Sequence, residues 1–386
     1  MILEVRMDCR ILLLAMAASP LLASPQKVIP QALLAPAHSC TFCDKESAGR
    51  MTVNGSFLIW QSKEWGLEFA SKSLTSSDPA SSLQTFKQKL FVPDFSWSPG
   101  CKVDLGYHLP HDAWDLYSRW TYYQGDFTHL KKHFESQIGP TGFGIVPLWH
   151  YPFISFSTQT SDPLRFTNAS ANWKLFFNSI DLDLGRAFTP LRSLIFRMHI
   201  GIKGAWLRQH YHVEYGNGTL INGIIRTAPA QSLRYNDSHM GYHSYSWGIG
   251  PRGGVESKWN LGWGFSLSGD AGLSILSSFF KQHTEYLDHL YNLTAAENLT
   301  NQLHLRDHMW LLAPVFEGTI GLNWGHCFGC RKNPVYWGAS IAYEVQYWWS
   351  QNHAHRNFAF QAPGNMWDMS GDLQMHGLTA TLRTDF

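Results

Sequence analysis

Residues 337–349 read WGASIAYEVQYWW, and every odd position in this stretch carries an apolar side chain. The even positions from 338 to 346 carry small or polar residues, among them Ser340, Glu344 and Gln346. An alternation of period two indicates a β-strand with one apolar face and one small, polar face. The stretch is longer than the about 9–11 residues that a tilted strand needs to cross an outer membrane.

The same alternation recurs at 101–109, 194–206 and 261–276. A soluble β-sandwich also alternates, but its strands are usually about 5–6 residues long. The hairpin predicted from 244–259 and 261–276, with its turn at Asn260, has much longer arms. The length of the strands therefore favours a membrane β-barrel, and a soluble all-β fold stays as the alternative.

Weaker alternation marks more strands along the chain. They are predicted at 53–62, 64–71, 86–97, 113–123, 171–178, 180–188, 208–215, 309–324 and 371–386. Because bacterial barrels favour even strand numbers and loops can hide weak strands, we predict a closed, transmembrane, antiparallel β-barrel of about 16 strands (14–18). Long outer loops are predicted near 124–170, 216–243, 277–308 and 351–370, with room for a short helix within 279–305.

The composition agrees with membrane strands. The chain holds 17 Trp, 15 Tyr and 24 Phe beside 32 Gly, while only 15% of its residues are charged. Outer-membrane barrels carry aromatic girdles of this kind. A net charge of +1 gives no sign of nucleic-acid binding. Beyond the N-terminal segment no apolar run is long enough for a membrane helix, so the exported chain crosses a membrane as strands or is soluble.

The N-terminus has the layout of a signal peptide. Arg6 and Arg10 precede an apolar run, and a stretch of small residues follows it up to Ala23. An N-terminal membrane anchor is the alternative, but Pro20 interrupts the run before it reaches membrane length. We predict a signal peptide at 1–23, an irregular periplasmic leader at 24–50 and the barrel at 51–386.

The C-terminus alternates up to a terminal aromatic residue, Phe386. We predict that this strand is the signal read by the bacterial barrel-insertion machinery. A terminal aromatic can arise by chance, but here it accompanies a signal peptide and long strands. The expected location is the bacterial outer membrane, with the membrane lipid and the insertion machinery as partners.

Three blocks of sequence resemble the Legionella and chlamydia-like major outer membrane porin family. They are FSWSPGCKVDLGY at 95–107 with HDAWDLYSRWT at 111–121, WKLFFNSIDLDLGR at 173–186 with HIGIKGAW at 199–206, and GIGPRGG at 248–254 with the strand from Trp259 to Phe280. The resemblance implies an abundant pore-forming barrel, held in disulfide-linked oligomers in the chlamydial relatives. Cys101 and the pair Ser277 and Ser278 depart from the pattern, which leaves the oligomer open.

The exported chain would keep an odd number of cysteines. They are Cys40, Cys43, Cys101, Cys327 and Cys330. Two Cys-x-x-Cys pairs, with His38 and His326 beside them, allow a zinc site. An oxidising periplasm instead favours disulfides, and the odd count suits bridges between chains. We therefore predict disulfide-linked homo-oligomers or envelope partners, and no metal or other cofactor.

Charged side chains on the inward face are the predicted functional residues. They are Asp104, Arg119, Asp181, Asp183, Arg197, His199, Lys203, Arg252, Glu256, Lys258, Asp270, Glu317, Glu344 and Arg383. In a water-filled barrel such groups act as fixed charges that select solutes by size and sign. Any single one of them can instead be a solvated wall residue without a selective role.

The sequence therefore predicts a porin for small hydrophilic solutes or ions, and not an enzyme. A non-conducting surface adhesin or structural envelope protein is the first alternative, and an outer-membrane hydrolase is the second. Ser, His and Asn are too plentiful to nominate a catalytic set. The pair His210 and His212 would share one face of a strand, where we interpret such histidines as solvated residues.

Overall fold

The computed structural model describes residues 50–77, 84–110, 114–133, 145–150, 155–156, 165–218, 220–224, 231–328, 335–357 and 366–386, which all belong to the compact unit Cys40–Phe386. The predicted signal peptide and nearly all of the predicted leader lie outside these residues. No helix in the described ranges is long and apolar enough to span a membrane.

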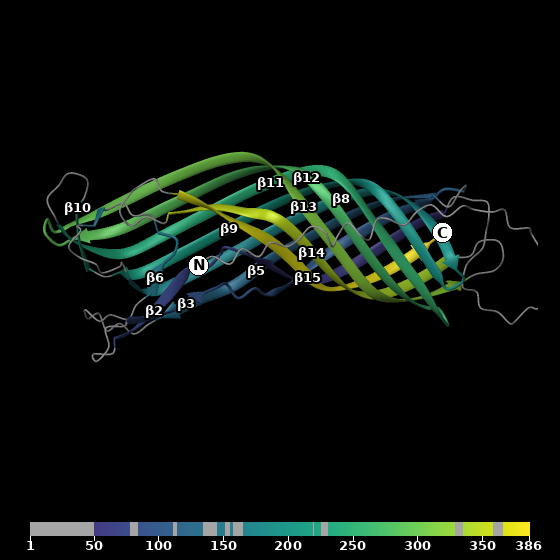
Figure 1. The fold of residues 1–386 in the computed structure, drawn as a ribbon, viewed down its shortest axis with the longest axis horizontal. Helices are drawn as coiled ribbons and strands as arrows, with labels where there is room; N and C mark the ends of the chain where they lie inside the picture. Colours follow the sequence, from purple (N-terminus) through teal and green to yellow (C-terminus); the bar gives the residue numbers. More distant parts are fainter. Residues whose placement is uncertain are drawn as a thin grey trace, which may run out of the picture. The chain divides into compact units, whose positions relative to one another are not determined.

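The described residues form β-strands joined by turns and short irregular segments (Figure 1). The strands are β1 (Arg50–Glu64), β2 (Ala70–Ser77), β3 (Gln84–Phe91), β4 (Trp97–His108), β5 (Trp114–His133), β6 (Ile145–Pro147), β7 (Ser155–Phe156), β8 (Phe166–Leu191), β9 (Leu194–Gly218), β10 (Leu220–Ile224), β11 (Gln231–Gly262), β12 (Phe265–Asn292), β13 (Glu297–Phe328), β14 (Val335–Asn357) and β15 (Met366–Asp385).

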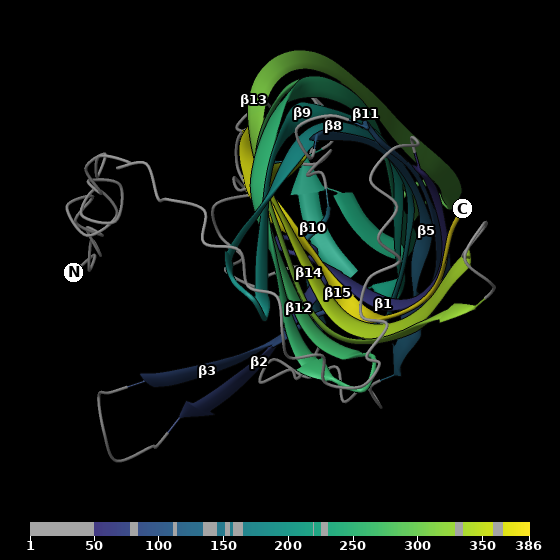
Figure 2. The ribbon, with the colours of Figure 1, turned by 90° about the vertical axis from the view of Figure 1, so that its right-hand side faces the viewer.

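Ten of these strands close a ring of antiparallel pairs. The order around the ring is β1, β4, β5, β8, β9, β11, β12, β13, β14 and β15, and β15 pairs with β1 again. Figure 2 shows the ring from one end. The predicted closed antiparallel β-barrel is confirmed, because the first and last strands pair over thirteen positions, from Thr52 with Asp385 to Glu64 with Leu373.

The ring has fewer strands than the sixteen predicted, because its strands are longer. Stretches 171–178 and 180–188 merge into β8, and 194–206 and 208–215 merge into β9. Most of 277–308, predicted as an outer loop with a short helix, continues β12 and β13, which are 28 and 32 residues long. Beyond the membrane the outer face of a strand meets water and carries polar residues, so the sequence there loses the apolar contrast that marks a membrane strand.

Two other predicted loops and one turn also differ from the structure. Much of 216–243 belongs to β9, β10 and β11, and 351–357 continues β14. The turn of the long hairpin lies at Trp263 and Gly264 instead of Asn260. Both turn residues have positive φ, of 54° and 83°, which lets two long strands reverse within two residues.

The remaining strands lie beside one end of the ring. The hairpin of β2 and β3 pairs through β2 with β6, which pairs in turn with β8. Strand β10 pairs with β11 and with β7. The opposite end of the ring carries the start of β1, the end of β15 and short connections such as that between β11 and β12. Outer-membrane barrels have short turns on the periplasmic side, so the end with β2, β3 and β10 faces outward.

An apolar band encircles the outer wall. On β11, Ile249 and Val255 are exposed between Trp247 and Trp259. These two tryptophans are about 40 Å apart along the strand, or about 30 Å along the axis of a barrel with strands tilted by about 40°. This distance matches the hydrocarbon core of a bilayer. The membrane-spanning segments of this wall are therefore 194–206, 247–259, 267–279 and 310–322.

Candidate functional site

The inner face of the barrel wall is the candidate functional site. On β9 the exposed residues Met198, Ile200 and Ile202 alternate with Arg197, His199, Gly201 and Lys203. The same alternation on the other ring strands directs all fourteen predicted residues inward: Asp104, Arg119, Asp181, Asp183, Arg197, His199, Lys203, Arg252, Glu256, Lys258, Asp270, Glu317, Glu344 and Arg383. Their use as the lining of a pore stays a prediction.

The centre of the membrane-spanning part holds a buried ion-pair network. Lys203 Nζ lies 2.8 Å from Asp181 Oδ1 on β8 and 2.9 Å from Glu317 Oε1 on β13. Arg252 joins the network, with Nη2 2.9 Å from Glu317 Oε2 and Nη1 2.8 Å from Asp183 Oδ2. The Lys203 side chain is fully buried. Since β11 and β12 separate β9 from β13 in the ring, the contact of Lys203 with Glu317 reaches across the interior.

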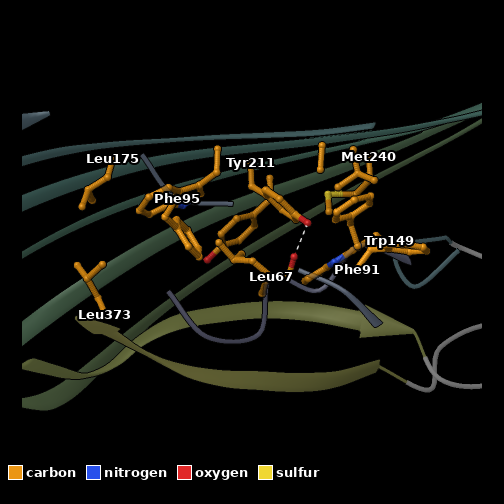
Figure 3. Close-up of a cluster of buried hydrophobic side chains, with 14 of the residues drawn as sticks. Leu67, Phe91, Phe95, Trp149, Leu175, Tyr211, Met240 and Leu373 are labelled. Atoms are coloured by element: carbon orange, nitrogen blue, oxygen red, sulfur yellow. Dashed lines mark hydrogen bonds between the residues drawn. The ribbon is translucent and has the colours of Figure 1, made fainter. Parts of the chain in front are cut away.

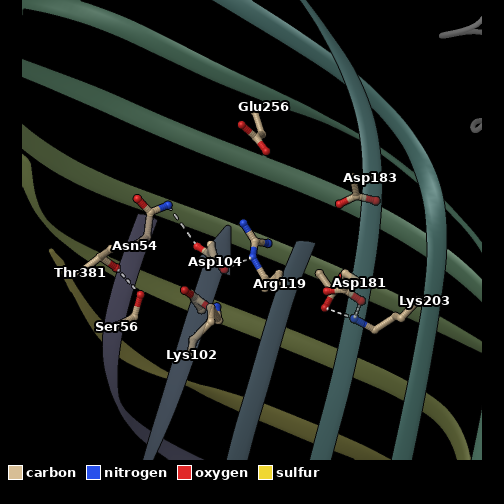
Figure 4. A network of polar contacts seen from close by, with 12 residues as sticks. Asn54, Ser56, Lys102, Asp104, Arg119, Asp181, Asp183, Lys203, Glu256 and Thr381 are labelled. Carbon is tan, nitrogen blue, oxygen red and sulfur yellow. Dashed lines mark hydrogen bonds and ion pairs between the residues drawn. The ribbon is translucent and has the colours of Figure 1, made fainter. Parts of the chain in front are cut away.

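A second ion pair crosses the interior from the other side of the ring. Lys102 Nζ on β4 lies 2.6 Å from Glu344 Oε2 on β14, although β1 and β15 separate these strands. Beside it, Arg119 Nε donates to Asp104 Oδ1 at 3.0 Å (Figure 4). The cationic and carboxylate side chains therefore neutralise each other inside the barrel. The electrostatic potential of the interior is not dominated by charges of one sign.

Nearer the end where β1 begins and β15 ends, the charges meet more water. Arg197 binds Asp115 through Nε at 2.9 Å and Glu256 through Nη1 at 2.8 Å. Arg383 binds Asp385 at 2.8 Å. The side chains of Glu256 and Arg383 are each 37% exposed. This end of the interior is open to solvent.

The predicted set is incomplete at three positions. Lys102, Asp115 and Asp385 each pair with a predicted residue but were not nominated. The alternation that nominated Asp104 applies equally to Lys102, two residues before it, so the signal was present in the sequence. Among the predicted residues, a ring nitrogen of His199 and a carboxylate oxygen of both Glu256 and Asp270 lie within 4.8 Å of one another. Within the described part of the chain, Lys258 forms no ion pair.

Aromatic side chains fill the interior on the outward side of the charges. Trp60, Tyr123, Trp173 and Trp348 are at most 1% exposed. The rings of Trp348 on β14 and Phe177 on β8 meet edge to face with centroids 5.3 Å apart. Contacts of this kind between strands that are not neighbours close the interior with apolar side chains.

A segment between β1 and β2 runs through this aromatic cluster. Tyr211 Oη donates to the carbonyl of Leu67 at 2.8 Å (Figure 3). Arg356 Nη2 donates to the carbonyls of Gly66 and Glu68 at 3.2 and 2.9 Å. Tyr211 and Arg356 belong to β9 and β14, on different sides of the ring. The chain at 66–69 is therefore held between two walls, inside the barrel.

One Ser, one His and one Asp meet beyond the membrane-spanning segments. His150 Nδ1 lies 3.2 Å from Ser238 Oγ and 3.7 Å from Asp288 Oδ1. Burial lowers the pKa of His150 to about 3 and raises the pKa of Asp288 to about 8. A catalytic triad needs the Ser and the Asp on different imidazole nitrogens. Here one nitrogen faces both groups, and both titratable groups are neutral at pH 7.

Two of the predicted disulfide cysteines lie in the described residues. Cys101 is a free, half-buried thiol on β4, and Cys327, at the end of β13, is disulfide-bonded. Cys40, Cys43 and Cys330 lie outside the described residues, so the pairing between chains stays a prediction. Phe386 exchanges backbone hydrogen bonds with Met51 and its side chain is 57% exposed. Its role as an insertion signal also stays a prediction.

Comparisons with known proteins give similar barrels and one family. No curated protein matches the chain. The outer membrane protease OmpT from Escherichia coli is 9% identical over 87% of this chain and 96% of its own, with a TM-score of 0.31. The toluene transporter TodX from P. putida is 8% identical over 87% of this chain and 89% of its own, with a TM-score of 0.29.

The family model of the Legionella pneumophila major outer membrane protein precursor matches residues 46–386. The match covers every strand of the closed ring. The chain, a β-barrel of the outer membrane, thus belongs to the Legionella major outer membrane protein family.

Proposed function

We propose that the protein is a porin that lets small hydrophilic solutes or ions diffuse passively across the outer membrane, without a catalytic step. The observation that carries this proposal is the charged inner face within the membrane-spanning part, where Arg119, Glu256 and Arg383 keep partly exposed side chains. Buried charges are costly unless they are paired, whereas charged side chains that stay partly exposed inside a barrel can act on water and aqueous solutes.

The proposed channel is narrow. A barrel of about eight strands is just wide enough for side chains to fill its interior, whereas an open aqueous channel is found at about 16–18 strands. The ring of ten strands lies near the lower limit, and ion pairs such as Lys203 with Glu317 cross it. We therefore expect small ions to pass, and only when the aromatic cluster around Trp348 separates.

A non-conducting surface protein is the second candidate. The aromatic cluster favours it, because Trp60, Trp173 and Trp348 leave the interior closed on the outward side. Strands β11, β12 and β13 also continue well beyond the apolar band, and this extension offers a surface to the outside. A protein of this kind would bind partners with its wall instead of conducting solutes.

Planar-bilayer recording of the folded protein separates the two candidates. A porin shows discrete conductance steps, and Trp348→Ala should raise the conductance or the open probability because it removes a ring that packs against Phe177. Trp349→Ala is the matched control, because Trp349 points outward and is 37% exposed. Silence of both the native protein and Trp348→Ala would contradict the porin and support the surface protein.

A further inference from the structure

The outer wall beyond the apolar band carries an unusual set of side chains. Strands β9, β11, β12 and β13 continue side by side past the aromatic belt of Trp247 and Trp310, whose ring centroids are 5.5 Å apart. We name the set the histidine face, and it consists of His210, His212, Glu214, Asp237, His239, His243, His283, Glu285, His289 and His304. None of these side chains is buried.

The pairing register brings these residues together in rows. His210, His243 and His283 are partners across three strands. Glu285 pairs with His304, and Glu214 pairs with His239. Because side chains directly opposite each other in an antiparallel sheet are close neighbours, residues distant in sequence form clusters. In three groups of three such residues, two of which share His239, the imidazole nitrogens and carboxylate oxygens lie within 4.8 Å of one another.

The first cluster has His239 at its centre. Glu214 Oε1 lies 3.1 Å from His212 Nε2 and 3.8 Å from His239 Nδ1. The other nitrogen of His239, Nε2, lies 3.0 Å from Asp237 Oδ1, which also meets His289 Nδ1. His239 thus belongs to two overlapping groups of three ligands, one on each of its nitrogens.

These separations suit a shared metal ion. Ligand atoms about 2.0–2.1 Å from a tetrahedral zinc ion are about 3.3–3.4 Å apart. The distances of 3.1 and 3.8 Å around Glu214 bracket this value, so small side-chain rotations would bring His212, Glu214 and His239 to an ion. Three protein ligands leave the fourth position open to water, unlike a structural zinc site, which has four protein ligands.

The second cluster lies on the neighbouring strands. His283, Glu285 and His304 form it, and the rings of His283 and His304 stack with centroids 5.6 Å apart. Glu285 Oε1 lies 3.7 Å from His304 Nδ1. Each group of three ligands therefore combines two imidazoles with a carboxylate, and the second cluster shares no residue with the first.

The chemistry of the ligands selects the kind of ion. Imidazole suits Zn²⁺, Cu²⁺ and Ni²⁺, whereas Ca²⁺ and Mg²⁺ need oxygen ligands, and Cu⁺ needs soft sulfur ligands. Metal binding also requires neutral imidazoles.

We propose that the histidine face binds divalent transition-metal ions, at the cluster centred on His239 and at the cluster of His283, Glu285 and His304. The face points away from the barrel interior and lies outside the membrane. The ion would therefore be taken from the medium around the cell. The proposal does not depend on conduction, so the outcome of the planar-bilayer recording does not decide whether the face binds metal, and metal binding does not decide whether the barrel conducts.

Calorimetric titration with Zn²⁺ tests the proposal on tag-free protein, folded in detergent and first stripped with a chelator. His239→Ala should weaken Zn²⁺ binding at the first cluster by about tenfold or more, because losing a residue that only hydrogen-bonds to a metal ligand already lowers metal affinity by about 10–100-fold. His304→Ala should do the same at the second cluster, and the double variant should lose both sites. His308→Ala is the control, because His308 lies on the same face of β13 but in neither cluster.

Three results would overturn the proposal. The first is a double variant that binds Zn²⁺ as the native protein does. The second is Ca²⁺ competing equally with Zn²⁺, which would mean that the carboxylates alone attract cations, and the third is the absence of any heat with the native protein. Heat-modifiable migration in detergent gels confirms that each variant is folded, and these exposed positions should leave it unchanged.

Discussion

Lys102 Nζ and Glu344 Oε2 lie 2.6 Å apart inside the barrel, although two strands separate β4 from β14 around the ring. Both side chains are at most 10% exposed. A pair of this kind ties opposite parts of the wall together, and its loss on one side leaves a buried charge without a partner.

Lys102→Met should therefore destabilise the barrel by about 3–5 kcal/mol, the usual cost of removing one member of a buried ion pair. The temperature at which the folded band disappears in detergent gels measures the effect. Lys281→Met is the control, since Lys281 is exposed on the outer wall. The double variant Lys102→Met and Glu344→Leu should recover most of the loss. A single variant as stable as the native protein would contradict this assignment.

Asp288 should make the stability of the barrel depend on pH. Burial raises its pKa from 3.8 to about 8, so the folded protein holds this proton more tightly than the unfolded chain does. Its contribution is complete below pH 4 and is lost as the pH rises to about 8. Asp288→Asn should therefore flatten the fall in unfolding temperature between these pH values.

Asp307 provides the comparison for this titration, because its side chain is 45% exposed, whereas that of Asp288 is 1% exposed. Asp307→Asn should leave the pH profile of the native protein unchanged. If Asp288→Asn and the native protein lose stability in parallel from pH 4 to 8, the buried carboxyl is not the group that titrates.

Arg356 should keep the segment at 66–69 in place. It donates to the carbonyls of Gly66 and Glu68, and its guanidinium lies 4.4 Å from the ring centre of Trp149. Arg356→Met leaves both carbonyls unsatisfied, at a cost of about 1–3 kcal/mol each. Faster amide hydrogen exchange at 66–69 is expected, while exchange at 251–256 in the membrane-spanning part of β11 should not change.

Arg356→Lys is an informative companion, because a single ammonium keeps the charge but not the planar contact with Trp149. We expect an intermediate exchange rate for it. Equal exchange at 66–69 in the native protein and in Arg356→Met would mean that other contacts, such as Tyr211 with Leu67, hold the segment alone.

Gly250 should not tolerate a side chain. A Cβ atom there would lie 1.9 Å from the carbonyl oxygen of Ile275 on the neighbouring strand, so the pairing of β11 with β12 would have to shift. Gly250→Ala should lower the unfolding temperature clearly. Gly55→Ala should have little effect, because a Cβ at Gly55 meets no atom within 4 Å. Equal stability of the two variants would contradict the close approach.

The alternation in the sequence determined which side chains face inward. At 194–206 and 337–349 the predicted apolar faces lie toward the membrane and the charged residues face the interior, as predicted, while Trp348 falls on the inward side. This assignment is local, because the direction of a side chain on a strand depends only on the parity of its position. Asp104, Lys203 and Glu344 could be predicted to face inward from their odd or even positions along the strands alone.

The number of strands in the ring could not be obtained in the same way. Outside the membrane a strand has water on its outer face, so 277–308 lacks the apolar contrast that identified 261–276. The registers of β12 with β13 extend through this region by backbone hydrogen bonds, which every residue except proline can form. The sequence pattern therefore ended where the membrane ends, although the strands continue.

The contents of the barrel were decided by the tertiary structure alone. Whether Lys203 meets Glu317, or His212 meets His239, depends on how many strands close the ring and on their stagger, and no single strand encodes either quantity. By itself, the sequence determined a membrane barrel with a charged inner face. Only the closure of the ring brought those charges into pairs, drew 66–69 into the interior and assembled the histidine face on the outer wall.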